Sequence, residues 1–213
     1  MKVELIDKMG TDLSVVNAAR VSYAKEKEEF EKSDERLIRY LAEHKHWSPF
    51  AHTFLSFRIK APVFVARQLV KHQVGLVWNE ESRRYITHDP EIYNIRKWRE
   101  KPDNSKQGSG EQIVISTELN LEVNEHLQQG LSLYNRLLLE NVAPEQARAV
   151  LPQSMYTNWI WSGTLYAFAR VCELRLDEHS QKETQEIARQ LDIHCHDAFP
   201  ISWKYLTKEK DEV

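Results

Sequence analysis

The residues best suited to chemistry begin in a stretch without any acidic residue, 61–78. Its proline fits the first position of a helix, which we expect to run to about residue 73. At helical spacing two pairs of side chains would be neighbours, namely Arg67 with Lys71 and Gln68 with His72. A row of donors without counter-charge fits either a solvated basic face or an anion site for phosphates.

The next seven residues, 79–85, bring acceptors, donors and two guanidinium groups together. Arginine suits bidentate contact with phosphate, whereas glutamate and serine suit ribose hydroxyls and base edges. By itself the same segment also fits a salt-bridged turn. The candidate binding residues here are Glu80, Glu81, Ser82, Arg83 and Arg84.

Two further arginines stand among apolar residues. Arg148 lies in the segment Ala-Arg-Ala-Val-Leu-Pro, and Arg175 lies between two leucines. Burying an arginine is costly unless the charge is paired. For Arg175 the partner would be either an acid such as Glu173 or Asp177, or the anion of a ligand.

Counting residues excludes several classes of site. The six glycines do not form a G-x-G-x-x-G fingerprint or a phosphate-binding P-loop, so any nucleotide must be held by side chains and helix ends. Cys172 and Cys195 are too few for a disulfide framework or a four-thiolate zinc site. The histidines at 44–52 and 194–196 lack a third ligand at standard spacing, so we expect no metal site.

Charge and hydropathy indicate a cytoplasmic protein. The net charge is −3, which disfavours nucleic acid as a partner. The first eight residues are already charged, so no secretory signal is expected. The longest stretch without charge, 149–169, contains proline, glutamine and asparagine, so we expect buried protein and no membrane span.

The periodicity of apolar residues predicts an α+β protein. Residues 53–60 alternate cleanly and predict a half-exposed strand, and 2–6 predicts another. Helices are expected to start at Asp12 and at residues 33–35. The polar segment 98–110 is expected to be a mobile loop. The remaining predicted helices cover 119–141, 144–152, 158–175 and 179–199.

Several ordered blocks of the chain resemble the flavin-dependent thymidylate synthases. The family signature is Arg-His-Arg, seven residues, then Ser-x-Arg, and it corresponds here to RQLVKHQVGLVWNEESRRY, residues 67–85. In this chain the triplet is Lys71-His72-Gln73, and eight residues precede the serine. The other matching blocks are 12–23, 46–68, 147–157 and 173–183.

The resemblance implies one domain over residues 1–213, with a small, mostly antiparallel sheet and a helical bundle. It also implies a set of residues for the nucleotide dUMP. Arg148 would be on the phosphate side, and Arg175 would bind the uracil ring and be catalytic. The implied dUMP-binding residues are Gln68, Lys71, Glu80, Glu81, Ser82, Arg83, Arg84, Arg148 and Arg175.

By the same resemblance, FAD would be the bound cofactor. Two positions that are asparagine in the family are Thr164 and Arg170 here. The implied FAD-binding residues are Ser48, Lys71, His72, Gln73, Glu80, Thr164, Leu165, Tyr166 and Arg170.

The implied reaction is reductive methylation of dUMP to dTMP. Methylenetetrahydrofolate would supply the carbon, reduced FAD the hydride, and NADPH the electrons that reduce the flavin again. The sites would lie between subunits of a homotetramer. No cysteine nucleophile is required, and Cys172 is expected to be a buried, inert thiol.

Two alternatives remain open. A related enzyme could modify C5 of another pyrimidine nucleotide, which the altered triplet and the extra residue would allow. A nucleic-acid-binding module could use the basic residues of 67–84, although the chain lacks a distributed basic stripe.

Overall fold

A four-stranded antiparallel sheet is the centre of the computed structural model, which describes residues 1–102 and 108–207. Every pair of neighbouring strands is antiparallel, as expected for an α+β protein. The spatial order of the strands is β1 (Lys2–Met9), β2 (Phe54–Pro62), β6 (Tyr156–Thr164) and β3 (Leu76–Glu80).

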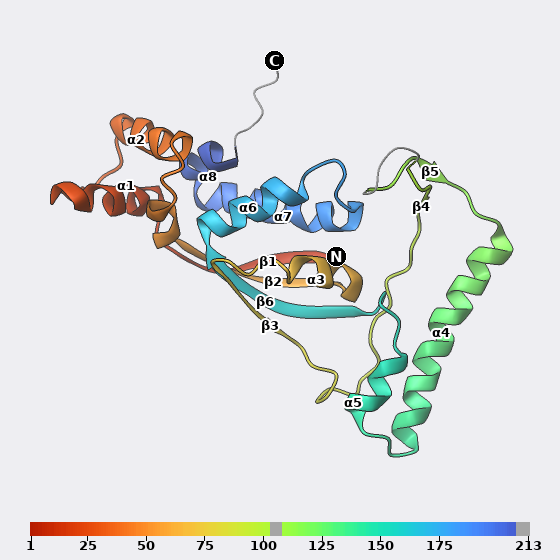
Figure 1. The fold of residues 1–213 in the computed structure, drawn as a ribbon. Helices are drawn as coiled ribbons and strands as arrows, with labels where there is room; N and C mark the ends of the chain where they lie inside the picture. The colour runs from red at the N-terminus through yellow and green to blue at the C-terminus, as the bar shows by residue number, and fades with distance from the viewer. Residues whose placement is uncertain (103–107, 208–213) are drawn as a thin grey trace.

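One face of this sheet carries the main core. Leu55, Phe57 and Ile59 of β2 are fully buried, which confirms the alternation predicted for residues 53–60. Two helices, α6 (Leu165–Arg175) and α7 (Lys182–Ala198), lie along that face (Figure 1). Burial of an aromatic or branched side chain contributes roughly 1.5–3 kcal/mol, so this face holds the sheet and helices together.

The helix predicted over 158–175 is wrong in its first half. Residues up to Thr164 form β6, and α6 starts only afterwards. In β6 every second side chain is buried, including Trp159 and Trp161, which is the period of a strand. Gly163 permits the pairing with β3, because a Cβ there would lie 2.4 Å from the carbonyl oxygen of Gly75.

The helix predicted to run from Pro62 to residue 73 is too long. The observed helix, α3 (Val63–Leu69), is followed by a turn that contains Lys71, His72 and Gln73. The turn closes at Gly75, whose φ of +76° is in the region that favours glycine. The proposed helical spacing of these side chains with those of α3 therefore does not apply.

A helical lobe lies beyond one end of the sheet (Figure 1). It consists of α1 (Asp12–Arg20), α2 (Lys32–Glu43), α8 (Pro200–Thr207) and the 3₁₀ turns η1 (Val21–Tyr23) and η2 (Ser48–His52). Asp12 does cap a helix, but not its own. Its carboxylate accepts from the backbone N–H groups of Ile201 and Ser202, at 3.1 and 2.8 Å, and so fastens α8 to α1.

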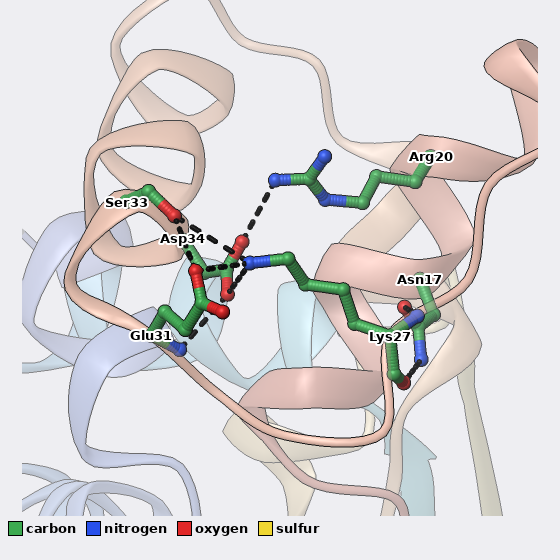
Figure 2. Close-up of polar contacts among 6 residues, drawn as sticks. All are labelled: Asn17, Arg20, Lys27, Glu31, Ser33 and Asp34. Atoms are coloured by element: carbon green, nitrogen blue, oxygen red, sulfur yellow. Dashed lines mark hydrogen bonds and ion pairs between the residues drawn. The ribbon is translucent and has the colours of Figure 1, made fainter.

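The charge run at 25–32 is tied to this lobe by a buried acid (Figure 2). Asp34 is fully buried and accepts from Arg20 Nη2 at 2.8 Å and Lys27 Nζ at 3.0 Å. Asn17 exchanges two hydrogen bonds with the backbone of Lys27. We call Asn17, Arg20, Lys27, Glu31, Ser33 and Asp34 the Asp34 cluster.

The segment predicted as a loop, 98–110, has paired arms. Residues of β4 (Trp98–Arg99) pair antiparallel with β5 (Gln112–Ile113), so this is a hairpin. Residues 103–107 of the predicted loop lie outside the described part of the chain.

The long helix α4 (Thr117–Leu139) stands apart from the sheet in Figure 1 and contacts the short α5 (Pro144–Ala147) and the turn η3 (Arg148–Val150). It confirms the helix predicted over 119–141, and its apolar side includes the buried Leu127 and Tyr134. Within residues 1–102 and 108–207, no helix combines the length and apolar character needed to cross a membrane.

Candidate active site

The end of α6 and the turn after α3 meet at Arg175 and His72. Arg175 Nε donates a hydrogen bond to His72 Nε2 at 2.9 Å, and the His72 ring lies 6.5 Å from that of Trp161. Burial, together with the charges of Arg175 and Arg170, lowers the pKa of His72 to about 4. His72 is therefore neutral near pH 7 and carries its proton on Nδ1.

Arg175 does not form the acid pair that was one of its two expected partners. In the described part of the chain, neither Glu173 nor Asp177 makes an ion pair with it. Its side chain is partly exposed, and a neutral imidazole leaves its positive charge uncompensated. This arrangement favours the other expectation, in which a ligand supplies the negative charge.

Arg175 and Gln68 line the same open cavity of about 770 Å³. The volume is in the range that holds a nucleotide-sized ligand. The walls come from α3, the end of α6, the turn between α6 and α7, and the two arms of the β4–β5 hairpin. The resemblance implies that Gln68 and Arg175 bind one ligand, and the two residues line one cavity in the structure.

Glu80 and Glu81 lie at the other end of β3, where the neighbouring strand β6 holds both. Glu80 Oε1 accepts from Thr157 Oγ1 at 2.7 Å, and its Oε2 accepts from Trp78 Nε1 at 3.2 Å. Glu81 Oε2 accepts from the side-chain amide of Asn158 at 2.8 Å. Both carboxylates are thus fixed in orientation.

Ser82, Arg83 and Arg84 follow in a turn. Ser82 Oγ accepts from the backbone and side chain of Arg84, and the Arg84 guanidinium lies 5.1 Å from the Tyr85 ring. Arg84 is exposed, whereas Arg83 is only 6% exposed and donates to the carbonyl of His88. Arg84 is therefore placed to meet a ligand, and Arg83 holds the turn.

Arg148 lies in the turn η3, apart from both the cavity at Arg175 and the turn after β3. Its side chain is exposed and its Nε donates to the carbonyl of Glu145 at 3.3 Å, so the cost of burial expected for it does not arise. The residues expected to bind one nucleotide thus occupy three regions of a single chain: the cavity at Arg175, the turn after β3, and η3.

Apart from Glu80, which lies at the far end of β3, the residues expected to bind FAD gather around the start of α6 and the turn after α3. Thr164 caps α6 by accepting from the backbone of Ala167 at 3.1 Å. The Tyr166 ring lies 6.1 Å from Trp47, which precedes the exposed Ser48. Leu165 is fully buried and its backbone N–H donates to the carbonyl of Thr53 at 3.1 Å, so in this structure it supports the start of α6 from inside the fold.

Two of these residues fit a phosphorylated cofactor. Lys71 and Arg170 are exposed, and neither forms an ion pair among residues 1–102 and 108–207. Two exposed cations without a counter-charge in the described part of the chain match the negative charge of a diphosphate.

Sequence reasoning missed Trp78, Thr157 and Asn158. The helix predicted over 158–175 takes in Asn158 and begins directly after Thr157, and it hid the pairing of β6 with β3. Trp78 stacks on Trp159 with ring centres 4.4 Å apart and also donates to Glu80. A strand reading of the alternating residues in 156–164 was the signal available in the sequence.

Both cysteines are buried, as expected for Cys172. Burial raises the pKa of Cys172 and of Cys195, so neither thiol forms a thiolate readily. In the part of the chain that the structure describes, no group of three or more histidine, cysteine or acidic side chains is placed to hold a metal ion.

Comparison with known proteins is consistent with this geometry. Residues 4–201 match the family model described as "Thymidylate synthase complementing protein". A flavin-dependent thymidylate synthase of Kosmotoga olearia is 41% identical over 190 residues, which cover 87% of this chain and 81% of that protein. A flavin-dependent thymidylate synthase of Thermus thermophilus is 36% identical over 201 residues, which cover 94% of this chain and 73% of that protein.

Among solved structures, the UMP/dUMP methylase PolB from Streptomyces cacaoi, bound with 5-Br dUMP, superposes with a TM-score of 0.80. It is 30% identical, and the match covers 97% of this chain and 94% of that one. The same enzyme bound with 5-Br UMP gives a TM-score of 0.78 at 29% identity, with 97% and 93% covered. The chain belongs to the flavin-dependent thymidylate synthase family.

Proposed function

We propose that this enzyme converts dUMP to dTMP by reductive methylation at C5 of the uracil ring. The methylene carbon of methylenetetrahydrofolate forms a bond to C5 while its bonds to the folate nitrogens break, the proton at C5 leaves, and a hydride completes the methyl group. NADPH is the ultimate electron donor, so that dTMP, tetrahydrofolate and NADP⁺ are the products. The observation that carries the proposal is Arg175, held by neutral His72 at a nucleotide-sized cavity in a chain of this family.

Arg175 activates the uracil ring electrostatically. A guanidinium at N3 and O2 stabilises negative charge on the ring, which makes C5 nucleophilic. Because His72 accepts from Arg175 Nε without carrying a charge, it orients the guanidinium and leaves the Nη groups for the substrate. No thiol addition to the ring is needed, in agreement with two buried cysteines.

The other nucleotide-binding residues divide by chemistry. Gln68 and Lys71 meet the nucleoside, Glu80 and Glu81 accept from ribose and base donors, and the phosphate is bound by Ser82, Arg84 and Arg148. Arg83 supports the phosphate site indirectly. Its buried guanidinium donates to the carbonyl of His88 and so fixes the turn after β3. The exposed cations fit a phosphate dianion.

FAD is the flavin that we assign to the enzyme. Lys71, Gln73 and Arg170 bind its phosphates, and Ser48, His72, Glu80, Thr164 and Tyr166 orient it. Leu165, which is fully buried, supports the start of α6 next to two of them. Bound flavin, once reduced, supplies the hydride that completes the methyl group.

The active enzyme is a cytoplasmic homotetramer in this proposal. Arg148, the turn after β3 and the cavity at Arg175 are separate regions of one chain. Sites built from several subunits would bring such regions to one nucleotide. The chain also exposes large apolar side chains, among them Val77, Tyr23 and Leu139, which subunit contacts would cover.

The proposal is tested by incubating flavin-loaded enzyme with dUMP, methylenetetrahydrofolate and NADPH. The expected result is a visible spectrum of oxidised flavin before the reaction and the mass of dTMP after it. Absence of flavin from both purified and FAD-soaked protein would refute the cofactor assignment.

A second candidate function is methylation of UMP at C5. The observation in its favour is the structural likeness to PolB, whose description names both UMP and dUMP. Competition between equal concentrations of UMP and dUMP decides between them, with the ratio of methylated products read by mass spectrometry. A product mixture dominated by methylated UMP would favour this second function.

A further inference from the structure

Three consecutive polar residues are buried at the start of α7. Glu183 is 8% exposed, Thr184 is fully buried and Gln185 is 3% exposed. Polar side chains are rarely buried unless each is hydrogen-bonded. We call these three residues the α7 triplet, and each of them is hydrogen-bonded to a different part of the fold.

Thr184 leads to α3. Its hydroxyl donates to Gln68 Oε1 at 3.1 Å, and the Gln68 amide nitrogen donates to Gln181 Oε1. Gln68 is thereby held at both ends of its amide group. Since Gln68 lines the cavity at Arg175, Thr184 sets the orientation of one wall.

Gln185 is hydrogen-bonded to the backbone of the turn between α6 and α7. Its amide nitrogen donates to the carbonyl oxygens of Asp177, Glu178 and Ser180, with the shortest contact of 2.8 Å to Ser180. Asp177 and Ser180 line the same cavity. One buried side chain therefore fixes the path of this turn along a second wall.

Glu183 forms an ion pair with an arginine of the β4–β5 hairpin. Arg99 Nη2 donates to both of its carboxylate oxygens, at 2.8 and 2.9 Å, and Arg99 Nε donates to Ser109 Oγ at 2.8 Å. Gly108, with φ of +85°, brings this arm against the α6–α7 turn, where a Cβ would lie 3.1 Å from the carbonyl oxygen of His179. Arg99, Gly108 and Ser109 form a third wall.

We propose that the α7 triplet positions three walls of the substrate cavity, and that the hairpin arms carrying Arg99 and Ser109 form one side of the nucleotide site. Successive residues of a helix point about 100° apart, so three neighbours reach three different elements. All three elements line one cavity. This inference rests on the proposed function, because it takes that cavity as the dUMP site.

The experiment compares Thr184→Val, which has nearly the same shape but no hydroxyl, with Thr184→Ser, which keeps it. Binding of dUMP to flavin-loaded enzyme is measured by isothermal titration calorimetry, together with kcat and KM. Thr184→Val is expected to weaken dUMP binding about tenfold and to raise KM more than it lowers kcat. Thr184→Ser is expected to restore both values.

The matched control is Arg20→Lys in the Asp34 cluster. It perturbs the ion pair between Arg20 and the buried Asp34, which lies away from the cavity. A purely structural defect lowers the fraction of folded protein, and therefore the number of sites titrated, while the dissociation constant stays the same. Arg20→Lys is expected to behave in that way. Thr184→Val is expected to change the dissociation constant itself.

A second variant protects the test if Thr184→Val does not fold. Arg99→Lys keeps the charge but cannot bond Glu183 and Ser109 together, and it is expected to weaken dUMP binding to a similar extent. Unchanged dUMP binding in every variant that folds, with wild type binding normally, would overturn the inference and leave the function standing. Wild type that binds no dUMP would instead overturn the proposed function.

Discussion

Two buried carboxylates of this enzyme, Asp34 in the N-terminal lobe and Glu183 at the start of α7, are held by the same chemistry in different settings. Each accepts from an arginine at 2.8 Å. Burial pushes the pKa of each upward, yet the hydrogen bonds outweigh it, so both pKa values lie below their ordinary values. Their electrostatic balance is therefore alike.

The two carboxylates differ in the part of the fold to which the bound arginine connects them. Around Asp34, Arg20 and Lys27 connect the acid to one loop and two helices of the same lobe (Figure 2). Around Glu183, Arg99 leads to a hairpin arm that lines the candidate cavity. The same type of buried pair thus stabilises a lobe in one region and shapes a binding site in the other.

The largest expected effect lies in the cavity itself. Arg175→Ala removes the group that we propose stabilises charge on the uracil ring, and we expect dTMP formation to fall about 10²- to 10³-fold. Single-turnover kinetics at saturating dUMP checks this, and circular dichroism checks the fold. Near-normal turnover would show that Arg175 has only a structural role, and the two regions would then not differ in function.

The Asp34 cluster is expected to show the reverse pattern. Asp34→Ala leaves Arg20 and Lys27 without their buried acid, and we expect a loss of about 3 kcal/mol in the free energy of unfolding. Turnover per folded, flavin-loaded molecule should stay close to that of wild type. Urea unfolding and kinetics on the same sample measure both. A large loss of turnover without loss of stability would contradict the comparison.

Acid should act on His72 before it acts on either carboxylate. The folded-state pKa of His72, about 4, is below its ordinary value of 6.5, so between these values the unfolded chain binds a proton that the folded chain does not. Stability is therefore expected to fall as the pH drops through this window. Asp34 and Glu183 also stabilise the fold. Their contribution is present at pH values above their ordinary pKa values of 3.8 and 4.5, and it is lost in stronger acid.

His72→Gln separates these contributions. Urea unfolding across the pH range should show a smaller fall between pH 6.5 and 4 in the variant, with the acid-induced loss below pH 4 retained. An identical pH profile for wild type and variant would mean that the imidazole gains no protection from protonation in the fold.

The smallest effect is expected from two buried groups outside both regions. Cys172 and Cys195 are buried with raised pKa values, so replacing both by alanine should leave dTMP formation running at close to the wild-type rate. Mass spectrometry of the nucleotide product measures this. Complete loss of activity in a folded, flavin-loaded double variant would require a thiol in the reaction.

Local patterns in the sequence predicted much of the fold. The strand β2 and the helices α2 and α4 were predicted from periods of 2 and 3.6 residues, and the structure confirms these elements. The strand at 156–164 was not predicted, because Ile160 stands between two tryptophans and obscures the alternation, and a short apolar run of this kind fits a buried strand or a buried helix. Pairing with β2 on one side and β3 on the other decided the outcome.

The candidate site divides in the same way. Residue types alone indicated phosphate and nucleotide chemistry at 67–85, and the resemblance pointed to Arg175. The bond between Arg175 and His72 joins positions 103 residues apart, and the bond between Arg99 and Glu183 joins positions 84 apart. No local period encodes such contacts.

The sequence by itself thus determined the class of protein, the absence of glycine-rich phosphate loops and the chemical types available for a nucleotide site. The tertiary structure decided which of those groups meet. It placed Thr157 and Asn158 against Glu80 and Glu81, and it turned three buried polar residues of α7 toward three walls of one cavity. The physical reason is that a buried polar group must find a partner, and only the packing of distant elements determines which partner is within reach.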